Sequence, residues 1–228
     1  MYRLHIANKN YSSWSLRPWV LMRELDIPFE ERLTPFETGS NGSPFRDFSP
    51  TGLVPCLVDG NSVIWESLGI VEYLAERYDG VWPEDAAARA WARCASAEMH
   101  AGFAELRQRC TMNCGIRAQL TEVPPSLQRD LTRLDELWSE GITRFGGPYL
   151  AGPEFTAVDA FYAPVAFRIQ SYGLELDELA MAYTERLLQL SSMRQWYRDA
   201  LREPWREPGH EAEVSEFATL LEDYRTRD

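Results

Sequence analysis

The sequence contains little of what marks secreted or membrane-spanning proteins. Four cysteines among 228 residues are far fewer than a disulfide-stapled extracellular domain carries, and the first residues show no long apolar stretch of the signal-peptide kind. No uninterrupted apolar run approaches the roughly 18 to 20 residues that are needed to span a bilayer. We therefore expect a cytoplasmic protein with reduced thiols and no membrane partner.

Basic residues are outnumbered by acidic ones. Lysine and arginine together number 23, whereas aspartate and glutamate number 35, which gives a formal net charge of −12 and a pI near 4.8. This balance would repel a phosphate backbone unless one face were locally basic, so nucleic acid is not an expected partner. The three histidines are distant in sequence from Cys110 and Cys114, and we therefore expect no metal site.

The composition is that of a globular protein with a substantial core. Hydrophobic residues make up 45% of the chain, aromatic residues 12% and charged residues 25%. These values exclude a disordered or collagen-like chain. The length fits one large domain or two modest ones, and a change of pattern near residue 80 favours two.

Residues 1–79 alternate between strand and helix periodicity, as an α/β domain does. Tyr2 to Ala7 has the period-two alternation of a strand, while Ser15 and Pro18 suit the first turns of a helix. The turn Asp59-Gly60-Asn61 between two short apolar runs predicts a β-hairpin. The predicted order is β-α-β-α-β-β-α, with strands over 2–7, 29–33, 54–58 and 62–65, helices over 13–25 and 66–78, and one helical turn over 45–48 within an irregular crossover at 34–50.

A helical domain is expected after a short linker. Residues 80–85 break the pattern, and helical periodicity dominates residues 86–228. Thr156 and Asp159 have the spacing of a capping box directly before an apolar stretch, which marks the start of a helix. We predict an all-helical second domain with helices over 84–109, 126–145, 156–172 and 188–202, followed by a final helix or surface arm.

Four short motifs follow one another along the chain. They are Tyr11-Ser12-Ser13-Trp14-Ser15, Val54-Pro55-Cys56-Leu57, Glu66-Ser67 and Thr156-x-x-Asp159. With the element order, these motifs make nearly the whole chain resemble the cytosolic glutathione transferases of the serine type, zeta-like members most of all. The resemblance implies a thioredoxin-like first domain that binds glutathione as co-substrate, a helical second domain that contributes the electrophile pocket, and a homodimer.

The resemblance also implies that a serine hydroxyl stabilises the glutathione thiolate, with Ser12 the first choice and Ser13 the second, and that Ser15 contributes to glutathione binding. The thiol is mostly protonated at neutral pH, and only the thiolate attacks electrophiles well. A hydrogen bond to a charged group is worth about 1.5–3 kcal/mol, or about one to two pKa units, and a helix N-terminus adds to it. The alternative interpretation is that these serines only cap the helix.

Other positions are implied to hold the remainder of the tripeptide. Val54 and Pro55 resemble the cis-proline segment of thioredoxin-like folds, where the residue before proline pairs with the ligand backbone as an added strand. Glu66 and Ser67 offer a carboxylate and a hydroxyl to the two charged groups of the γ-glutamyl end, although a helix cap is the simpler interpretation. The glycyl carboxylate has two candidate partners, Arg46 and Lys9.

The electrophile is expected between the domains, near Tyr11, Trp14, Phe103 and Arg107. The first helix carries no Cys-x-x-Cys, and serine stands where omega- and beta-type relatives have cysteine, which favours conjugation or isomerisation over thiol–disulfide exchange. We expect addition of glutathione to small apolar electrophiles, a detoxification reaction. The alternatives are a glutathione-dependent cis–trans isomerase of the maleylacetoacetate or maleylpyruvate type and a non-catalytic protein-interaction module.

Overall fold

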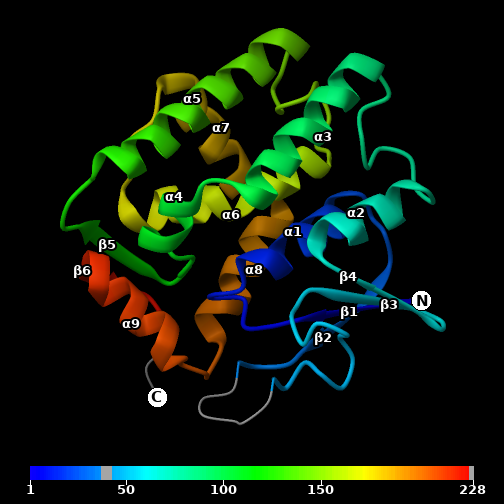
Figure 1. Cartoon of the computed structure of the whole chain (residues 1–228), viewed down its shortest axis with the longest axis horizontal. Helices are drawn as coiled ribbons and strands as arrows, with labels where there is room; N and C mark the ends of the chain where they lie inside the picture. The colour runs from blue at the N-terminus through cyan, green and yellow to red at the C-terminus, as the bar shows by residue number, and fades with distance from the viewer. Residues whose placement is uncertain (37–42, 226–228) are drawn as a thin grey trace.

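The amino-terminal part of the protein is a four-stranded mixed sheet with two helices packed against it (Figure 1). The computed structural model describes residues 1–36 and 43–225. The sheet order is β2-β1-β3-β4, with β1 parallel to β2 and antiparallel to β3, and β3 antiparallel to β4. The thioredoxin-like fold is therefore confirmed, with elements β1 (Tyr2–Ile6), α1 (Ser13–Glu24), β2 (Phe29–Leu33), β3 (Cys56–Asp59), β4 (Ser62–Trp65) and α2 (Ser67–Ala75).

The local sequence explains this part of the fold well. Leu4 and Ile6 of β1 are fully buried, whereas Arg3, directly before Leu4, is exposed, as the alternation predicts. In the crossover after β2, the Ser49 N–H donates to the Phe45 carbonyl at 2.8 Å, which is the bond pattern of a single helical turn. The centre of that crossover, residues 37–42, lies outside the described residues, as do residues 226–228.

The second part is helical, but it is not all-helical as predicted. A short antiparallel sheet pairs β5 (Ile116–Leu120) with β6 (Ala218–Asp223). Over residues 1–36 and 43–225, no helix has both the length and the hydropathy required to cross a membrane. The helices are α3 (Ala86–Ala101), α4 (Ala104–Arg109), α5 (Pro125–Phe145), α6 (Ala157–Tyr172), α7 (Glu178–Gln189), α8 (Ser191–Arg202) and α9 (Pro208–Phe217).

The long helix predicted over 84–109 is broken into α3 and α4. Phe103 has a φ of 53°, in the left-handed region that residues other than glycine rarely adopt. A Cβ at Gly102 would lie 2.8 Å from the Glu98 carbonyl oxygen, so glycine is required for this close approach. Because of the break, α4 runs in a different direction from α3. The Arg107 Cζ of α4 lies 5.3 Å from the centre of the Trp14 ring.

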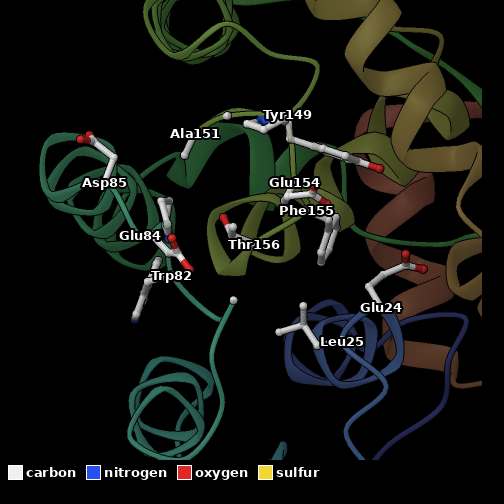
Figure 2. Close-up of a pocket in the computed structure, with 14 residues that line it drawn as sticks. Glu24, Leu25, Trp82, Glu84, Asp85, Tyr149, Ala151, Glu154, Phe155 and Thr156 are labelled. Atoms are coloured by element: carbon white, nitrogen blue, oxygen red, sulfur yellow. The ribbon is translucent and has the colours of Figure 1, made fainter.

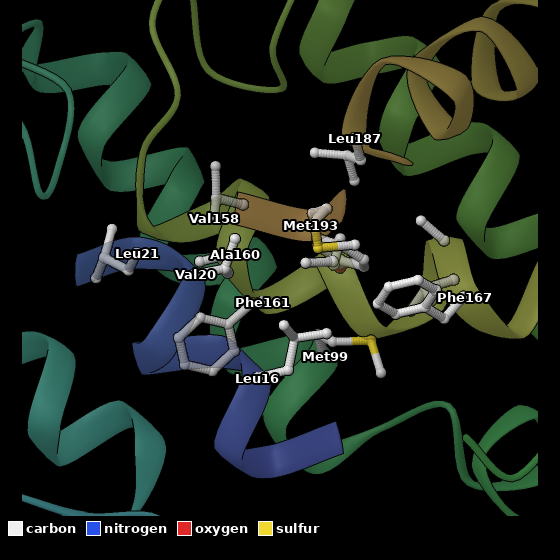
Figure 3. Close-up of a cluster of buried hydrophobic side chains, with 14 of the residues drawn as sticks. Leu16, Val20, Leu21, Met99, Val158, Ala160, Phe161, Phe167, Leu187 and Met193 are labelled. Atoms are coloured by element: carbon white, nitrogen blue, oxygen red, sulfur yellow. The ribbon is translucent and has the colours of Figure 1, made fainter. Parts of the chain in front are cut away.

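Helix α6 is the centre of the helical domain and is buried on nearly every side, which explains its apolar sequence. Its Phe161 lies beside Leu16 and Val20 of α1 in the shared core (Figure 3). Helix α1 therefore packs in the cores of both domains. This arrangement fixes the direction of α1 and places its amino terminus at the junction between them.

The start of α6 depends on the buried carboxylate of Asp159. This carboxylate accepts the Leu150 N–H at 3.0 Å, the Thr156 N–H at 2.9 Å and the Tyr183 hydroxyl at 2.8 Å, and it completes the predicted capping box. In Asp159→Ala, all three donors stay buried without an acceptor. We expect the free energy of unfolding, measured with urea, to fall by at least about 3 kcal/mol.

Tyr183→Phe is the control for this prediction, since it removes one of the three hydrogen bonds and leaves the carboxylate in place. It should lower the free energy of unfolding by only about 1 kcal/mol. A loss in Asp159→Ala that is no larger than the loss in Tyr183→Phe would show that the capping network does not hold the start of α6.

Candidate functional site

The amino terminus of α1 opens into a cavity of about 520 Å³ between the two domains. A smaller cavity of about 280 Å³ shares Trp14 and Val54 with it and adds Pro55 and Glu66. The two cavities adjoin, because they have these walls in common, and we refer to them together as the cleft. The residues predicted from sequence that line the larger cavity are Tyr11, Ser12, Ser13, Trp14, Val54 and Arg107.

The two candidate serines differ in their hydrogen bonds. The Ser12 hydroxyl donates to Ser15 Oγ at 2.7 Å, and Ser15 Oγ also accepts the Ala7 N–H at 3.3 Å. The Ser13 hydroxyl has no hydrogen-bond partner in the described part of the chain. Ser12 stands at the N-cap position, but its side chain makes no capping bond. The partial positive charge of the helix N-terminus is therefore left to act on the cavity.

The other end of the cleft combines a strained residue with an unsatisfied hydroxyl. The Val54–Pro55 peptide bond is cis, as the resemblance implies. Glu66 has φ 64° and ψ 132°, a conformation that is costly for a residue with a Cβ and that is found mainly at functional sites. Ser67 is fully buried, and its hydroxyl has no partner among the described residues. Buried polar groups are normally satisfied, so this end of the cleft is suited to a polar ligand.

The loop between β1 and α1 is held in place by the helical domain. The Glu203 carboxylate accepts the Lys9 N–H at 2.6 Å and the Asn10 N–H at 3.2 Å. The Lys9 carbonyl accepts the Trp196 Nε1–H at 2.8 Å, and the Asn10 carbonyl accepts the Cys114 N–H at 3.1 Å. Because Ser12 follows this loop directly, the helical domain helps to fix the position of its hydroxyl.

The carboxy-terminal segment covers Tyr11. The Tyr11 hydroxyl donates to the Glu211 carboxylate and accepts from Arg225 Nη1 at 2.9 Å, while the Tyr11 ring stacks on His210 with 5.0 Å between ring centres. Arg225 is also paired with Asp223. Burial and the hydrogen bond to Glu211 raise the pKa of Tyr11 to about 12. Tyr11 therefore lines the cavity with its ring, and its hydroxyl is committed to the carboxy-terminal segment.

The two candidate partners of the glycyl carboxylate do not reach the cleft. Arg46 Nη1 donates to the Pro50 carbonyl at 2.6 Å, and Arg46 lines a separate pocket beside β1 and β3. Lys9 is buried, and its Nζ lies 2.9 Å from Glu31 and 2.7 Å from Asp199. A buried ammonium group requires carboxylate partners, and these two carboxylates neutralise the charge of Lys9.

Sequence analysis missed several residues of the cavity wall and misplaced one. Phe103, predicted for the electrophile pocket, is 6% exposed, and its ring packs edge-on against Tyr162 in the core. A signal for Arg168 was present, because it is a charged residue inside the apolar stretch of α6, whereas nothing local indicates that α9 reaches the cavity. The missed residues are Phe36, Phe45, Leu53, Ala104, Gln108, Thr111, Met112, Arg168, His210 and Glu213.

The cysteines offer no competing nucleophile. All four are free thiols. Cys56 follows Pro55 directly, but burial raises the pKa of its thiol to about 11, so it stays protonated at neutral pH. Within the described ranges, no group of three or more His, Cys, Asp or Glu side chains is arranged to hold a metal ion.

A different cavity of about 570 Å³ lies at the opposite end of α1 (Figure 2). It is lined by Glu24 and Leu25, where α1 ends, by Trp82 and its neighbours in the interdomain segment, and by the loop at 149–156. Helix α1 has 12 residues, which places this cavity about 18 Å from Ser12. The serine, cis-proline and Glu66 motifs all lie at the first cleft, which is therefore the candidate site.

Comparison with known proteins identifies relatives of both domains. The model of the glutathione S-transferase N-terminal domain matches residues 11–77, and that of the C-terminal domain matches residues 84–199. Glutathione S-transferase GstB of Escherichia coli K12 is 28% identical over 209 residues, which are 86% of this chain and 92% of GstB. A dichloromethane dehalogenase of Methylorubrum extorquens is 46% identical over 61 residues, which are 26% of this chain and only 21% of the dehalogenase.

Solved structures show the same fold. A glutathione S-transferase from Rhodospirillum rubrum F11 superposes with a TM-score of 0.67 at 21% identity, over 94% of this chain and 99% of that protein. The C-terminal family match alone spans half of the chain, and the N-terminal match precedes it in the expected order. The chain therefore belongs to the glutathione S-transferase family.

Proposed function

We propose that this protein is a glutathione transferase that activates the thiol of glutathione for attack on a small electrophile. The observation that supports this most directly is the convergence of Ser12, the cis Val54–Pro55 bond and Glu66 on one cleft. Glutathione has a thiol near its centre and an amino-acid head group at one end. In the cleft, the Ser12 hydroxyl is available to the thiol. The Glu66 carboxylate and the neighbouring free hydroxyl of Ser67 are available to the head group.

Ser12 is the proposed donor to the sulfur. In the free protein its proton points to Ser15 Oγ. When glutathione binds, the Ser12 hydroxyl donates to the sulfur in place of Ser15 Oγ. Ser15 then donates its own proton to Ser12 Oγ, while the Ala7 N–H continues to hold Ser15. Ser13 is the second candidate, because its hydroxyl is free to donate. The hydroxyl and the dipole of α1 together lower the pKa of the bound thiol, which raises the fraction of nucleophilic thiolate.

The remaining contacts of glutathione follow from the backbone and charges of the cleft. The Val54 N–H and carbonyl pair with the cysteinyl residue as an added strand. The Glu66 carboxylate binds the γ-glutamyl ammonium group. The Ser67 hydroxyl, together with the amino terminus of α2, binds the γ-glutamyl carboxylate, and this contact satisfies the buried hydroxyl.

The larger cavity is the proposed site of the electrophile. Its wall near the serines is rich in aromatic rings, from Tyr11, Trp14, Phe36 and Phe45. The thiolate attacks the electrophilic carbon, a carbon–sulfur bond forms, and the leaving group departs with the electron pair of the broken bond while the thiol proton passes to solvent. Isomerisation of the maleylacetoacetate type would use the same thiolate. The homodimer and the cytoplasmic location stay predictions.

Removal of the donor hydroxyl tests the assignment of the serines. In Ser12→Ala, we expect the pKa of the bound glutathione thiol to rise by about one to two units, because a charge-assisted hydrogen bond is lost. Turnover should fall accordingly, while the Kd of glutathione changes little. Thiolate absorbance gives the pKa, and calorimetry gives the Kd.

Ser13→Ala is the matched comparison, since it removes the neighbouring hydroxyl on the same turn. If Ser13→Ala raises the thiol pKa and Ser12→Ala does not, the donor is Ser13. If neither variant changes it, the serines only terminate the helix. A wild-type protein that binds no glutathione would be a non-catalytic module, and turnover of maleylacetoacetate would identify an isomerase.

The strained conformation of Glu66 predicts that two variants of this residue will have the same glutathione affinity but different stabilities. Both Glu66→Gly and Glu66→Ala remove the carboxylate, so the Kd of glutathione should rise about ten-fold in each. Only glycine relieves the backbone strain at positive φ. Glu66→Gly should therefore be more stable than Glu66→Ala by about 1 kcal/mol.

Glu76→Gln is the control at the opposite end of α2, because Glu76 is exposed and pairs with Arg77 away from the cleft. It should alter neither glutathione affinity nor stability. Equal glutathione affinities in wild type, Glu66→Gly and Glu66→Ala would exclude Glu66 as the anchor of the γ-glutamyl group.

A further inference from the structure

Three arginines from three helices lie near one another beside the larger cavity, and two of them pack against Trp14. The Arg17 Cζ of α1 lies 3.9 Å from the centre of the Trp14 ring, and the Arg107 Cζ of α4 lies 5.3 Å from it. Arg168 of α6 lines the same cavity, and its Nη1 donates to the Cys110 carbonyl and to the Arg107 carbonyl, the latter at 3.2 Å. Positive charge from both domains is therefore concentrated beside the predicted position of the electrophile.

Two of these charges, those of Arg17 and Arg168, are buried without carboxylate partners among the described residues, whereas Arg107 is half-buried. Arg17 is 1% exposed, and neither its Nε nor its Nη1 has a hydrogen-bond partner there. Arg168 is 4% exposed, and its Nε also has none. Burial, together with repulsion from the other two arginines, lowers the pKa of Arg17 to about 9. Desolvation of an unpaired charge is costly, and a bound anion would relieve this cost.

Nearby acidic groups do not neutralise the arginines. Glu66 and Glu213 line the cleft, but both are exposed, and neither forms an ion pair with an arginine of this cluster in the described chain. Glu66 has the γ-glutamyl ammonium group as its partner in the proposed function. The chain as a whole carries a net charge of −12, so this local excess of positive charge is opposite in sign to the rest of the protein.

We propose that the larger cavity binds the second substrate through a carboxylate held by Arg107 and Arg168, with an aromatic or unsaturated body against Trp14. The inference rests on the proposed transferase function and narrows its electrophile from apolar molecules to those that also carry an anionic group. The planar fork of an arginine matches a carboxylate with two parallel hydrogen bonds. Arg17 is a positioning residue, because it stacks on Trp14 and is shielded from the cavity by burial.

The test compares two conjugates that differ by one carboxylate, S-(4-carboxybenzyl)glutathione and S-benzylglutathione. Their Kd values are measured by calorimetry on the full chain. In the wild type, we expect the carboxylate to lower the Kd about ten-fold. In Arg107→Gln, this preference should shrink to about two-fold or less, and in Arg107→Lys, which keeps the charge, part of it should return.

Arg109→Gln is the matched control. Arg109 lies on α4 like Arg107, but it is paired with Glu105 and does not line the cavity. This variant should keep the full preference for the carboxylate. If Arg107→Gln lowers the affinity for both conjugates equally, Arg107 has only a structural role and the proposal is wrong. If Arg107→Gln does not fold, the two Kd values on the wild type still decide whether the cavity prefers a carboxylate.

The outcomes separate this inference from the proposed function. Equal Kd values for the two conjugates on the wild type overturn the carboxylate site but leave the glutathione transferase function in place. If glutathione and both conjugates fail to bind, the proposed function fails. Titration of 4-methylbenzoate against 4-methylbenzamide then decides on the anion site alone: a preference for the benzoate that is lost in Arg107→Gln supports it, and no preference overturns it.

Discussion

The geometry of the cleft depends on a polar junction at residues 8–11, where the loop before α1 enters the helical domain. Beyond the two N–H groups that Glu203 accepts, the Asn10 side chain accepts the Gly115 N–H at 2.9 Å and donates to Asn113 Oδ1 at 2.7 Å. Each buried donor left without a partner costs about 1–3 kcal/mol, so this loop cannot move alone. The position of the Ser12 hydroxyl is therefore a property of both domains.

The first domain and the motif positions could be predicted because their signals are local. The alternation of Leu4 and Ile6, the turn at Asp59-Gly60-Asn61 and the capping box at Asp159 each act over a few residues, and each has the expected structure. The cis bond before Pro55, by contrast, follows from the resemblance to a known fold and not from a local signal. Local signals of this kind survive in the folded protein because the tertiary contacts reinforce them.

The rest of the cleft could not be predicted, because it is made by contacts between distant segments. Strand β5 pairs with β6 about a hundred residues later, and neither is long enough for its alternation to stand out. The break before Phe103 follows from a single close approach at Gly102, which helical periodicity does not reveal. Lys9 is the only lysine in the sequence, and a lone lysine indicates a solvated surface residue, whereas Trp19 and Trp196 enclose it here.

Charge burial distinguishes the cleft from the rest of the protein. Elsewhere the buried cations are neutralised: Lys9 by two carboxylates, and Arg225 by Glu211 and Asp223. At the cleft, Arg17 and Arg168 are buried without such partners in the described chain. Helix α1 carries Arg17 and, at its amino terminus, the serines, where the dipole also favours an anion, while Arg168 belongs to α6. Three helices thus concentrate positive potential at the cleft, which suits a thiolate and a negatively charged second substrate that are bound there together.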